Sequence, residues 1–518
     1  MQKKFVVVLL LFIILIGGFL RFYKLGNSAF DRDEFFELNS SYGYFKTGHF
    51  VAWNFNDEKP FPANMQDDSS NERAETFRWQ LVQLYRFHEP TEFLTRALGS
   101  AWGVIGILLV YFITLSFTGN FYIALLAALL TAVGGSEIIY SRRLRMYAMF
   151  FPIYLLFSWT VFRFYESEYR GKIKFFSKIH EKIGFNPAYI LPALITGLIS
   201  YNVHLLTLNI GAVIAAYAFL FFAISTWQKK KILLDKYSLT LAAIAFGLLA
   251  TRLPIFYSYY KSIKKNINFF QSNYDFFREY FSDFIYISLG VVLVIIGIWY
   301  LSKKMQRNKE AAFLFLSGFV PLALAVFTWK REESHRYIYF LQSFGIILSA
   351  VGIYGVIQLV VFWIKNHNCK RIAAVILLVA FSAGIDYGYL AKNSGVYVPK
   401  SNPYYPDFEA IFGYVKQHKS AEDVMITRTY RSFYWRGAKI KTYDIKSLRM
   451  GATDCENKID EIVKENPSGW AVFPKVDKLN LCSAGRKYYE DNFIRIKDPS
   501  IPSSVLLYYW GNTPNNSR

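Results

Sequence analysis

Residues 5–20 read FVVVLLLFIILIGGFL, a run of 16 residues without a charged side chain. A run of this length, drawn here as the span 5–22, is long enough for one helix to cross a bilayer. No small-residue cleavage site follows it and many similar runs come later, so an uncleaved membrane helix is favoured over a signal peptide. This stretch therefore sets the class of the protein.

The composition agrees with a protein that lies mostly in a membrane. The chain has 518 residues, of which 53% are hydrophobic and only 19% are charged, with 49 Phe and 38 Tyr. We expect an all-α polytopic membrane protein with about 11 transmembrane helices. The predicted spans are 5–22, 98–117, 121–139, 146–164, 187–203, 205–224, 238–256, 284–301, 311–328, 337–362 and 372–390.

The orientation follows from the short loops. Lys3 and Lys4 place the amino terminus inside, and every second loop is then rich in Lys and Arg, as the positive-inside rule requires. This bias explains most of the formal net charge of +21 without a nucleic-acid partner. Residues 31–92, predicted to lie outside, differ because they hold 12 acidic and six basic residues.

The chain divides into a membrane part and a soluble tail. We predict a transmembrane domain over 1–390, with a first external loop at 23–97 that contains a juxtamembrane helix and a lid-like loop at 257–283. Residues 391–518 form a small extracytoplasmic α/β domain, since strand-like runs at 424–427, 470–473 and 505–508 alternate with helical patterns. Asp407 can cap the first of these helices. Whether Cys455 and Cys482 pair in this tail is left open.

An acidic cluster follows the first span, where residues 30–37 read FDRDEFFE. Ionised carboxylates beside a bilayer are costly unless they have partners, which makes such a cluster a candidate functional site. Asp33 or Glu34 could accept a proton from a hydroxyl group or bind a divalent cation. A solvated loop or a helix cap explains the same residues without any chemistry.

Arginines gather at two other predicted external positions. Residues 140–147 read YSRRLRMY, in which Arg142 and Arg145 are three residues apart and share a helical face. Arg336 begins the tenth span. Because external arginines run against the positive-inside bias, a bound anion such as a phosphate is a good explanation. The alternative is that these side chains snorkel to lipid headgroups.

Two weaker motifs lie on the same predicted side. Glu58 begins the sequence EKP at 58–60, which by spacing alone is a solvated turn, and His204 ends the sequence YNVH at 201–204. His204 could be a metal ligand, a hydrogen-bond donor or a structural residue at a helix junction. The convergence of acids, arginines and a histidine on one membrane face matters more than any single motif.

Several of these segments, in this order, resemble one known family. The motifs LRFYKLG (20–26) with Asp33-Glu34, FLTRALGSAWG (93–103), YSRRLRMY, YNVH and HRYIY (335–339) are similar to those of membrane glycosyltransferases of the GT-C fold. The branch they resemble holds the protein O-mannosyltransferases and aminoarabinose transferases. The resemblance covers residues 18–345, with an insertion at 61–78 next to the EKP match.

The resemblance implies a reaction and a role for each residue. It implies transfer of a sugar from a polyprenyl-phosphate-linked donor to a lipid, protein or glycan acceptor at the outer face of the cell membrane, with inversion. Asp33 would act as the catalytic base or position the acceptor, with Glu34 in support. Arg142, Arg145, Arg336 and Tyr147 would bind the donor phosphate. Glu58 and His204 would bind the acceptor or, as in the aminoarabinose branch, a divalent metal ion; the mannosyl branch needs none.

Two other classes of protein compete with this interpretation. An oligosaccharyltransferase or polymer ligase would share the fold and the lipid carrier, but the Trp-Trp-Asp segment of the oligosaccharyltransferases is absent from the sequence. A lipid or polysaccharide transporter would show repeated halves and polar groups near the bilayer midplane, and the sequence shows neither. The sugar, the acceptor and the length of the carrier stay open.

Overall fold

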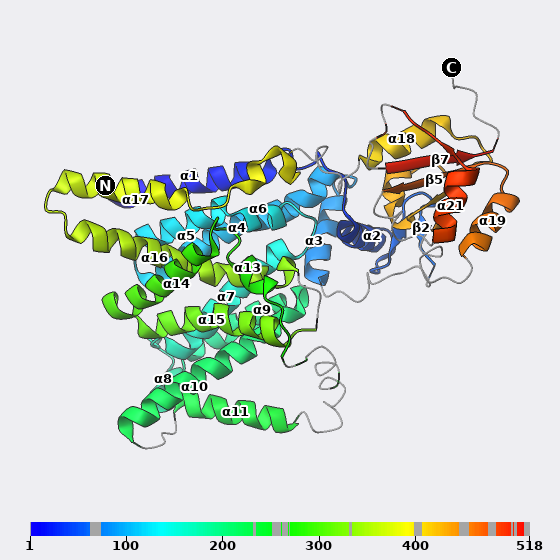
Figure 1. Cartoon of the computed structure of the whole chain (residues 1–518). Helices are drawn as coiled ribbons and strands as arrows, with labels where there is room; N and C mark the ends of the chain where they lie inside the picture. Colours follow the sequence, from blue (N-terminus) through cyan, green and yellow to red (C-terminus); the bar gives the residue numbers. More distant parts are fainter. Residues whose placement is uncertain are drawn as a thin grey trace. The chain divides into compact units, whose positions relative to one another are not determined.

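The computed structural model describes residues 2–62, 74–230, 235–250, 261, 268, 270–330, 334–397, 407–444, 455–474, 483–498, 501 and 505–511. The chain forms two compact units (Figure 1). The first consists of Met1–Tyr23, Arg73–Phe77 and Ala97–Gly388, and the second of Lys24–Glu72, Arg78–Arg96 and Tyr389–Arg518. The first external loop of the predicted topology thus packs mainly with the tail. The predicted domain division at residue 390 stays a prediction.

The first unit is built from helices that run alongside one another (Figure 1). They are α1 (Gln2–Phe22), α4 (Glu92–Thr118), α5 (Phe121–Val133), α6 (Gly135–Ser141), α7 (Tyr147–Glu166), α8 (Lys174–Ile183), η3 (Pro187–Tyr189), α9 (Ile190–Val203), η4 (Leu205–Leu208), α10 (Asn209–Lys229), α11 (Lys236–Ala250), α13 (Asp275–Tyr280), α14 (Ile287–Trp299), η5 (Tyr300–Lys304), α15 (Asn308–Thr328), η6 (His335–Tyr337), η7 (Tyr339–Leu341), α16 (Gln342–Phe362) and α17 (His367–Ser382).

The prediction of a mostly helical, multi-span membrane protein is confirmed, but with fewer clear spans. In the described residues, seven helices are long and apolar enough to cross a membrane, or nine if two bent helix pairs each form one span. The pairs are α5 with α6, bent by 56°, and α8 with η3 and α9, bent by 108°. The two remaining predicted spans coincide with α11 and α17, which have 15 and 16 residues. The count of 11 therefore stays a prediction.

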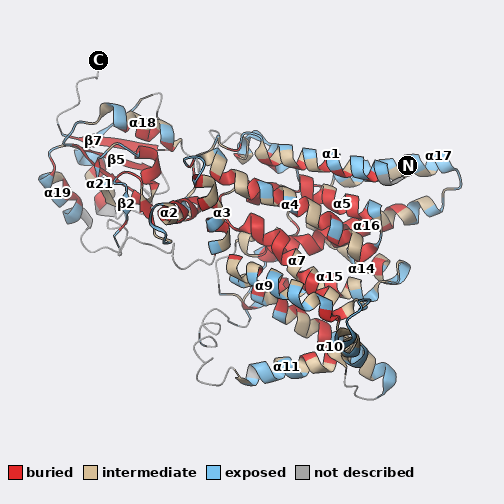
Figure 2. Ribbon diagram, turned by 180° about the vertical axis from the view of Figure 1, so that it is seen from behind, coloured by how far each residue is buried: buried red, intermediate tan, exposed pale blue. Residues whose placement is uncertain are grey.

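Exposed apolar side chains mark the surfaces of the first unit that fit lipid. Leu15 on α1 is 70% exposed, and Leu198 on α9 and Val379 on α17 are exposed to a similar extent. Figure 2 shows the contrast with α7, which is largely buried. Water would oppose so much exposed apolar surface, whereas hydrocarbon does not.

Two glycines allow α14 and α16 to approach closely. A Cβ atom on Gly297 would lie 2.0 Å from the carbonyl oxygen of Leu348, and one on Gly352 would lie 2.0 Å from that of Leu293. Small residues at such a crossing let helix backbones touch, which is how membrane helices gain packing energy. Any larger side chain at either position would force these two helices apart.

A buried carboxylate joins three helices at one end of the first unit. Glu166, at the end of α7, forms ion pairs with Lys236 of α11 at 3.0 Å and with Lys309 of α15 at 2.6 Å. The hydroxyls of Tyr217 and Tyr237 also donate to its Oε1, at 3.1 and 2.8 Å. With its oxygens saturated in this way, Glu166 can be buried without a large desolvation penalty.

The second unit combines a helical part with a mixed sheet. Its elements are α2 (Arg32–Thr47), β1 (Trp53–Asn54), β2 (Lys59–Pro60), the later residues of α3 (Glu75–Tyr85), the first turn of α4, η8 (Gly388–Leu390), η9 (Lys392–Ser394), α18 (Phe408–His418), β3 (Val424–Thr427), η11 (Thr429–Trp435), β4 (Lys441–Asp444), α19 (Cys455–Glu465), β5 (Gly469–Pro474), α21 (Ser483–Asn492), β6 (Ile494–Arg495) and β7 (Val505–Trp510).

The sheet has the strand order β4-β3-β5-β7-β6, with β3 parallel to β4 and β5, and β7 antiparallel to β5 and β6. The predicted α/β tail is therefore confirmed, including the cap that Asp407 provides to α18 through the N–H of Ala410 at 3.1 Å. Strands β5 and β7 are fully buried (Figure 2). The pairing of Cys455 with Cys482 lies outside the described residues.

Segments from the two ends of the chain interlock within the second unit. The hydroxyl of Tyr434 accepts a hydrogen bond from the Phe30 N–H at 2.7 Å, and Ser432 Oγ accepts one from the Phe55 N–H at 3.0 Å. The Phe30 ring also packs edge-on against Phe433. The segment that holds the acidic cluster is thus fixed by the aromatic turn η11 of the tail.

Candidate active site

Helix α2 positions Asp33 in its first turn. Asp31 is the N-cap: its Oδ1 accepts the N–H of Glu34 at 2.9 Å, and Glu34 Oε2 accepts the N–H of Asp31 at 2.9 Å. This capping box fixes where the helix begins. Asp31 is therefore a structural residue at the start of α2. Asp33 is half-buried, so a carboxylate that water can still reach sits at a rigid helix start.

Glu34 is held by a buried arginine. Arg96 donates from Nε to Oε1 at 2.8 Å and from Nη2 to Oε2 at 2.7 Å. Its guanidinium also donates to the carbonyl oxygens of Ser28 at 2.7 Å and Ala29 at 2.9 Å. A forked pair of this kind is strong and directional. Glu34 thus supports Asp33 by anchoring α2, while a direct part in chemistry stays a prediction.

Glu58 lies on the exposed turn between the short antiparallel strands β1 and β2. Its φ of 53° is left-handed, which costs a non-glycine residue about 1 kcal/mol or more. An exposed side chain on a hairpin whose strands have only two residues each is a poor anchor for a metal ion. The role predicted for Glu58 in acceptor or metal binding finds no support in this geometry.

Arg142 closes the end of α1. Its Nη1 donates to the carbonyl oxygens of Arg21 at 2.9 Å and Tyr23 at 2.7 Å. Because the last carbonyls of a helix lack partners within it, these bonds stabilise the α1 terminus. Arg142 is buried by this contact. Its predicted role at a phosphate stays a prediction beside this structural one.

The structure brings Arg145, Tyr147 and His204 together in the first unit. The Arg145 guanidinium lies 5.7 Å from the centre of the Tyr147 ring, and the Tyr147 and His204 rings are 5.6 Å apart. The sharp turn after α6 places Arg145 beside the start of α7, and a break between α9 and η4 presents His204. The Arg145 guanidinium can bind an anion at this point, and the two rings place further polar groups beside it.

His204 also has a local structural task. Its Nδ1 accepts the N–H of Leu206 at 3.1 Å, so the side chain caps η4. A neutral ring that accepts at Nδ1 carries its proton on Nε2, which is then a donor and not a metal ligand. The described residues also hold no group of three or more His, Cys, Asp or Glu side chains suited to a metal. Glu58 and His204 therefore fit a divalent metal poorly.

Arg336 belongs to η6, at the approach to α16. Its Nη2 donates to the Tyr337 hydroxyl at 3.2 Å, and its guanidinium lies 5.0 Å from the centre of that ring. Arg143 and Arg336 are both within electrostatic range of Tyr140, whose ring is 6.2 Å from that of Tyr147. Two segments that carry predicted phosphate-binding arginines thus meet around Tyr140 in the first unit.

Four residues with important contacts were not predicted from the sequence. Arg96 belongs to the motif FLTRALGSAWG (93–103) but was given no role there. A charged residue at the start of an apolar helix nevertheless indicates that it has a specific partner. Asn202 accepts hydrogen bonds from the backbone and side chain of Thr76, which fixes the start of α3. Glu137 and Asp283 form an acid pair, and a glutamate within the predicted span 121–139 could have been noticed in the same way.

Comparisons of sequence give no relative: no family model and no curated protein matches the chain. Solved structures do match. ArnT from Cupriavidus metallidurans, bound to undecaprenyl phosphate, superposes with a TM-score of 0.56 and 12% identity, covering 99% of both chains. The chain has the GT-C fold. The predicted resemblance is thereby confirmed at the level of the fold, over nearly the whole length.

A second GT-C structure shows the same likeness over less of its length. The oligosaccharyltransferase AglB from Archaeoglobus fulgidus, in complex with an inhibitory peptide and a dolichol-phosphate, matches with a TM-score of 0.57 and 11% identity. The match covers 91% of this chain and 69% of AglB. In the apo form of the Archaeoglobus enzyme the TM-score is 0.59, with 92% and 70% of the two chains covered. The ArnT structure and this AglB complex thus share the fold, and each contains a polyprenyl-type phosphate.

Proposed function

We propose that this GT-C protein is a glycosyltransferase that moves a sugar from a polyprenyl-phosphate-linked donor to an acceptor hydroxyl or phosphate. The observation that carries the proposal is the full-length match to ArnT bound to undecaprenyl phosphate, together with arginines placed at the break between α6 and α7. The fold suggests the class of the carrier, and the arginines supply the positive charge that a phosphate needs.

The proposed reaction is a single displacement. Asp33 takes the proton from the acceptor oxygen, which then attacks the anomeric carbon as the bond from that carbon to the donor phosphate oxygen breaks. The polyprenyl phosphate leaves with the bonding electron pair, and Arg145 and Arg336 stabilise its charge. Attack from the opposite side inverts the anomeric configuration. The half-exposed position of Asp33 in a capped helix supports its role as the base.

A single-sugar donor is favoured over an oligosaccharide donor, because the Trp-Trp-Asp segment expected of oligosaccharyltransferases does not occur in the 518 residues. The orientation, with the site and tail outside, is supported by the alternation along the predicted spans of loops that are rich in Lys and Arg with loops that are not. The sugar and the acceptor are matters for experiment.

Mass spectrometry of lipid-linked sugars and cell-envelope glycans, with and without active protein, tests this function. Cells that express Asp33→Asn should accumulate the donor and lose one glycosylated product, while the variant inserts into the membrane normally. Asp31→Asn is the matched control, because asparagine is an equally good N-cap and should preserve both the helix and the product. Full product formation by Asp33→Asn would remove Asp33 from the reaction.

A further inference from the structure

A pair of acids, of which Glu137 is buried and Asp283 is partly buried, lies outside the residues assigned above. Glu137, in α6, is 1% exposed, and Asp283 lies in the loop between α13 and α14. Their carboxyl groups are close enough to interact electrostatically. Asp283 Oδ1 accepts the N–H of Ser136 at 2.9 Å. In the described part of the chain, no other residue donates a hydrogen bond to either oxygen of Glu137.

The charges around the pair balance only when one further positive charge is present. Arg21 of α1 is fully buried, lies within electrostatic range of Glu137, and donates to the carbonyl oxygens of Thr131 and Ala132. Two ionised carboxylates and one guanidinium would leave a net charge of −1 in a buried site. One proton shared by the two acids would make the net charge of the site zero, whereas a divalent cation would make it positive. Like charges this close do not both ionise readily.

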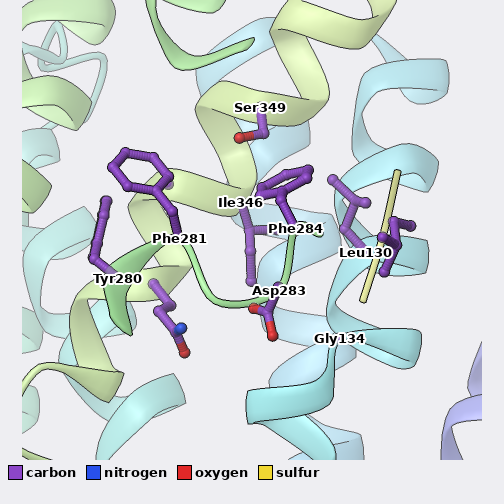
Figure 3. Close-up of a pocket in the computed structure, with 11 residues that line it drawn as sticks. Leu130, Gly134, Tyr280, Phe281, Asp283, Phe284, Ile346 and Ser349 are labelled. Atoms are coloured by element: carbon purple, nitrogen blue, oxygen red, sulfur yellow. The ribbon is translucent and has the colours of Figure 1, made fainter. Parts of the chain in front are cut away.

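A small cavity beside the pair extends the polar site. It has a volume of about 20 Å³, enough for one water molecule, and Asp283, Gln342 and Ser349 are among its lining residues (Figure 3). Gln342 Oε1 and Ser349 Oγ have no partner among the described residues. Gln342 Nε2 donates to Ser136 Oγ at 3.3 Å. A water molecule there would satisfy these orphaned oxygens and connect α16 to the acid pair.

The pair sits at the bend that leads into the arginine segment. Gly134 separates α5 from α6, and a Cβ atom there would lie 2.1 Å from Glu137 Oε2, so the bend needs a glycine. Figure 3 shows Gly134 and Asp283 on neighbouring segments beside the cavity. Helix α6 ends at Ser141, four positions after Glu137, and Arg142 follows. The acid pair therefore ties the loop before α14 to the short helix that precedes the arginines.

We propose that Glu137 and Asp283 share one proton and act as a positioning pair, which holds α6 so that the segment 142–145 can receive the donor phosphate. The inference rests on the proposed function for the identity of that phosphate. When the proton is present, a hydrogen bond joins the two acids. When it is lost, two carboxylates repel each other and α6 moves.

Other charged or titratable groups lie around the pair and enter the design of a test. Arg21 from α1, Tyr339 from η7 and Asp386 from the segment after α17 are within electrostatic range of one or both acids, and Tyr280 from α13 lines the cavity with Asp283. Tyr140 and His335 contact the Tyr339 ring, and the Glu279 carbonyl oxygen accepts a hydrogen bond from Gln342. Burial raises the pKa of Asp283, which fits a carboxyl group that keeps its proton. Burial lowers the pKa of His335 to about 4, so this histidine does not titrate at alkaline pH.

Donor kinetics over a pH series test the pair. In the wild type, the KM for a polyprenyl-phosphate sugar should rise about tenfold as the pair loses its proton at alkaline pH. Glu137→Gln should abolish this rise, because its amide donates to the Asp283 carboxylate at every pH. Glu137→Ala should show a raised KM throughout. An alkaline rise in Glu137→Gln equal to that of the wild type would overturn the proposal.

Infrared spectroscopy of the free protein gives an answer that does not depend on transfer. The wild type should show the carbonyl band of a protonated carboxylic acid that disappears on alkaline titration, and Glu137→Gln should lack it because Asp283 is then ionised. The same band in both proteins would overturn the shared proton. If the band is present in the wild type and absent from Glu137→Gln, the shared proton is supported. If that same wild-type protein transfers no sugar, the proposed function is overturned instead.

Discussion

Arg96 and Glu34 form a two-bonded ion pair across 62 residues of sequence, with both side chains at most 3% exposed. The same guanidinium binds the carbonyls of the segment before α2. The pair therefore fixes both the entry to α2 and its first turn, where Asp33 lies. It is the structural support of the proposed catalytic base.

Glu34→Gln should destabilise the second unit by about 3–5 kcal/mol, the effect of leaving one buried partner of an ion pair without its counter-charge. Glutamine still serves in a capping box, so the loss reports the ion pair rather than the cap. Chemical denaturation in detergent measures the change. Glu168→Gln is the control, because its pair with Arg170 is exposed and contributes little. Equal stability of the wild type and Glu34→Gln would contradict the assignment.

Arg145→Ala should lower kcat/KM for the donor by about 10²–10³-fold, as expected for loss of one group that stabilises transition-state charge. Arg142→Ala should chiefly lower the apparent melting temperature, since Arg142 closes the end of α1. Steady-state kinetics and thermal unfolding on both variants separate the two roles. Unchanged donor kinetics in Arg145→Ala would remove this residue from the phosphate site.

Chelation should leave activity unchanged, because Glu58 is exposed and His204 uses Nδ1 to cap η4. The measurement is sugar transfer before and after treatment with EDTA, with elemental analysis of the purified protein. His204→Asn is the companion variant: it keeps a capping side chain but loses the ring beside Tyr147. Activity that EDTA abolishes and a divalent metal restores would show that these residues, or others, do bind a metal.

Stability should fall in mild acid because of His335. Burial lowers its pKa to about 4 from an ordinary value of 6.5, so the unfolded chain takes up this proton at a higher pH than the folded protein does. The free energy of unfolding is then constant above about pH 6.5 and falls between that pH and 4, by roughly 3 kcal/mol in total.

Thermal unfolding of the wild type and His335→Gln at pH 7.5 and pH 5 measures this effect. The wild type should lose more stability than the variant. His88→Gln, at an exposed site, should behave like the wild type. Parallel losses in the wild type and His335→Gln would assign the acid sensitivity to other groups.

The sequence predicted most of the membrane helices because apolar runs are local and long. The three strand-like runs and the capped helix of the tail were also found, since their patterns are short-range. The bend at Gly134 was missed: two adjacent glycines weaken a helix, yet only the tertiary position of Glu137 requires one of them. Strand β4 was missed because its side chains are mostly polar or exposed at a sheet edge.

At the candidate site, the sequence predicted which charged residues could act chemically but not which side chains they contact. Asp33 and the arginines stood out as charges beside apolar runs. The contacts of Glu34 with Arg96 and of Arg142 with the end of α1 depend on tertiary structure, as does the meeting of Tyr147 with His204. Such pairings across tens to hundreds of residues leave no periodic signal in one sequence.

The hydrogen bond between Phe30 and Tyr434 joins residues that are 404 positions apart, so it forms late in biosynthesis. At translation rates of about 5–20 residues per second, residues 24–62 wait roughly 20–80 s for η11 to be made. Throughout that interval, the aromatic side chains around Phe30 and Phe35 lack the partners that bury them. Helix α2 can therefore reach its final packing only after the ribosome has made η11, so assembly of the second unit must wait for residues more than 350 positions later in the chain than α2.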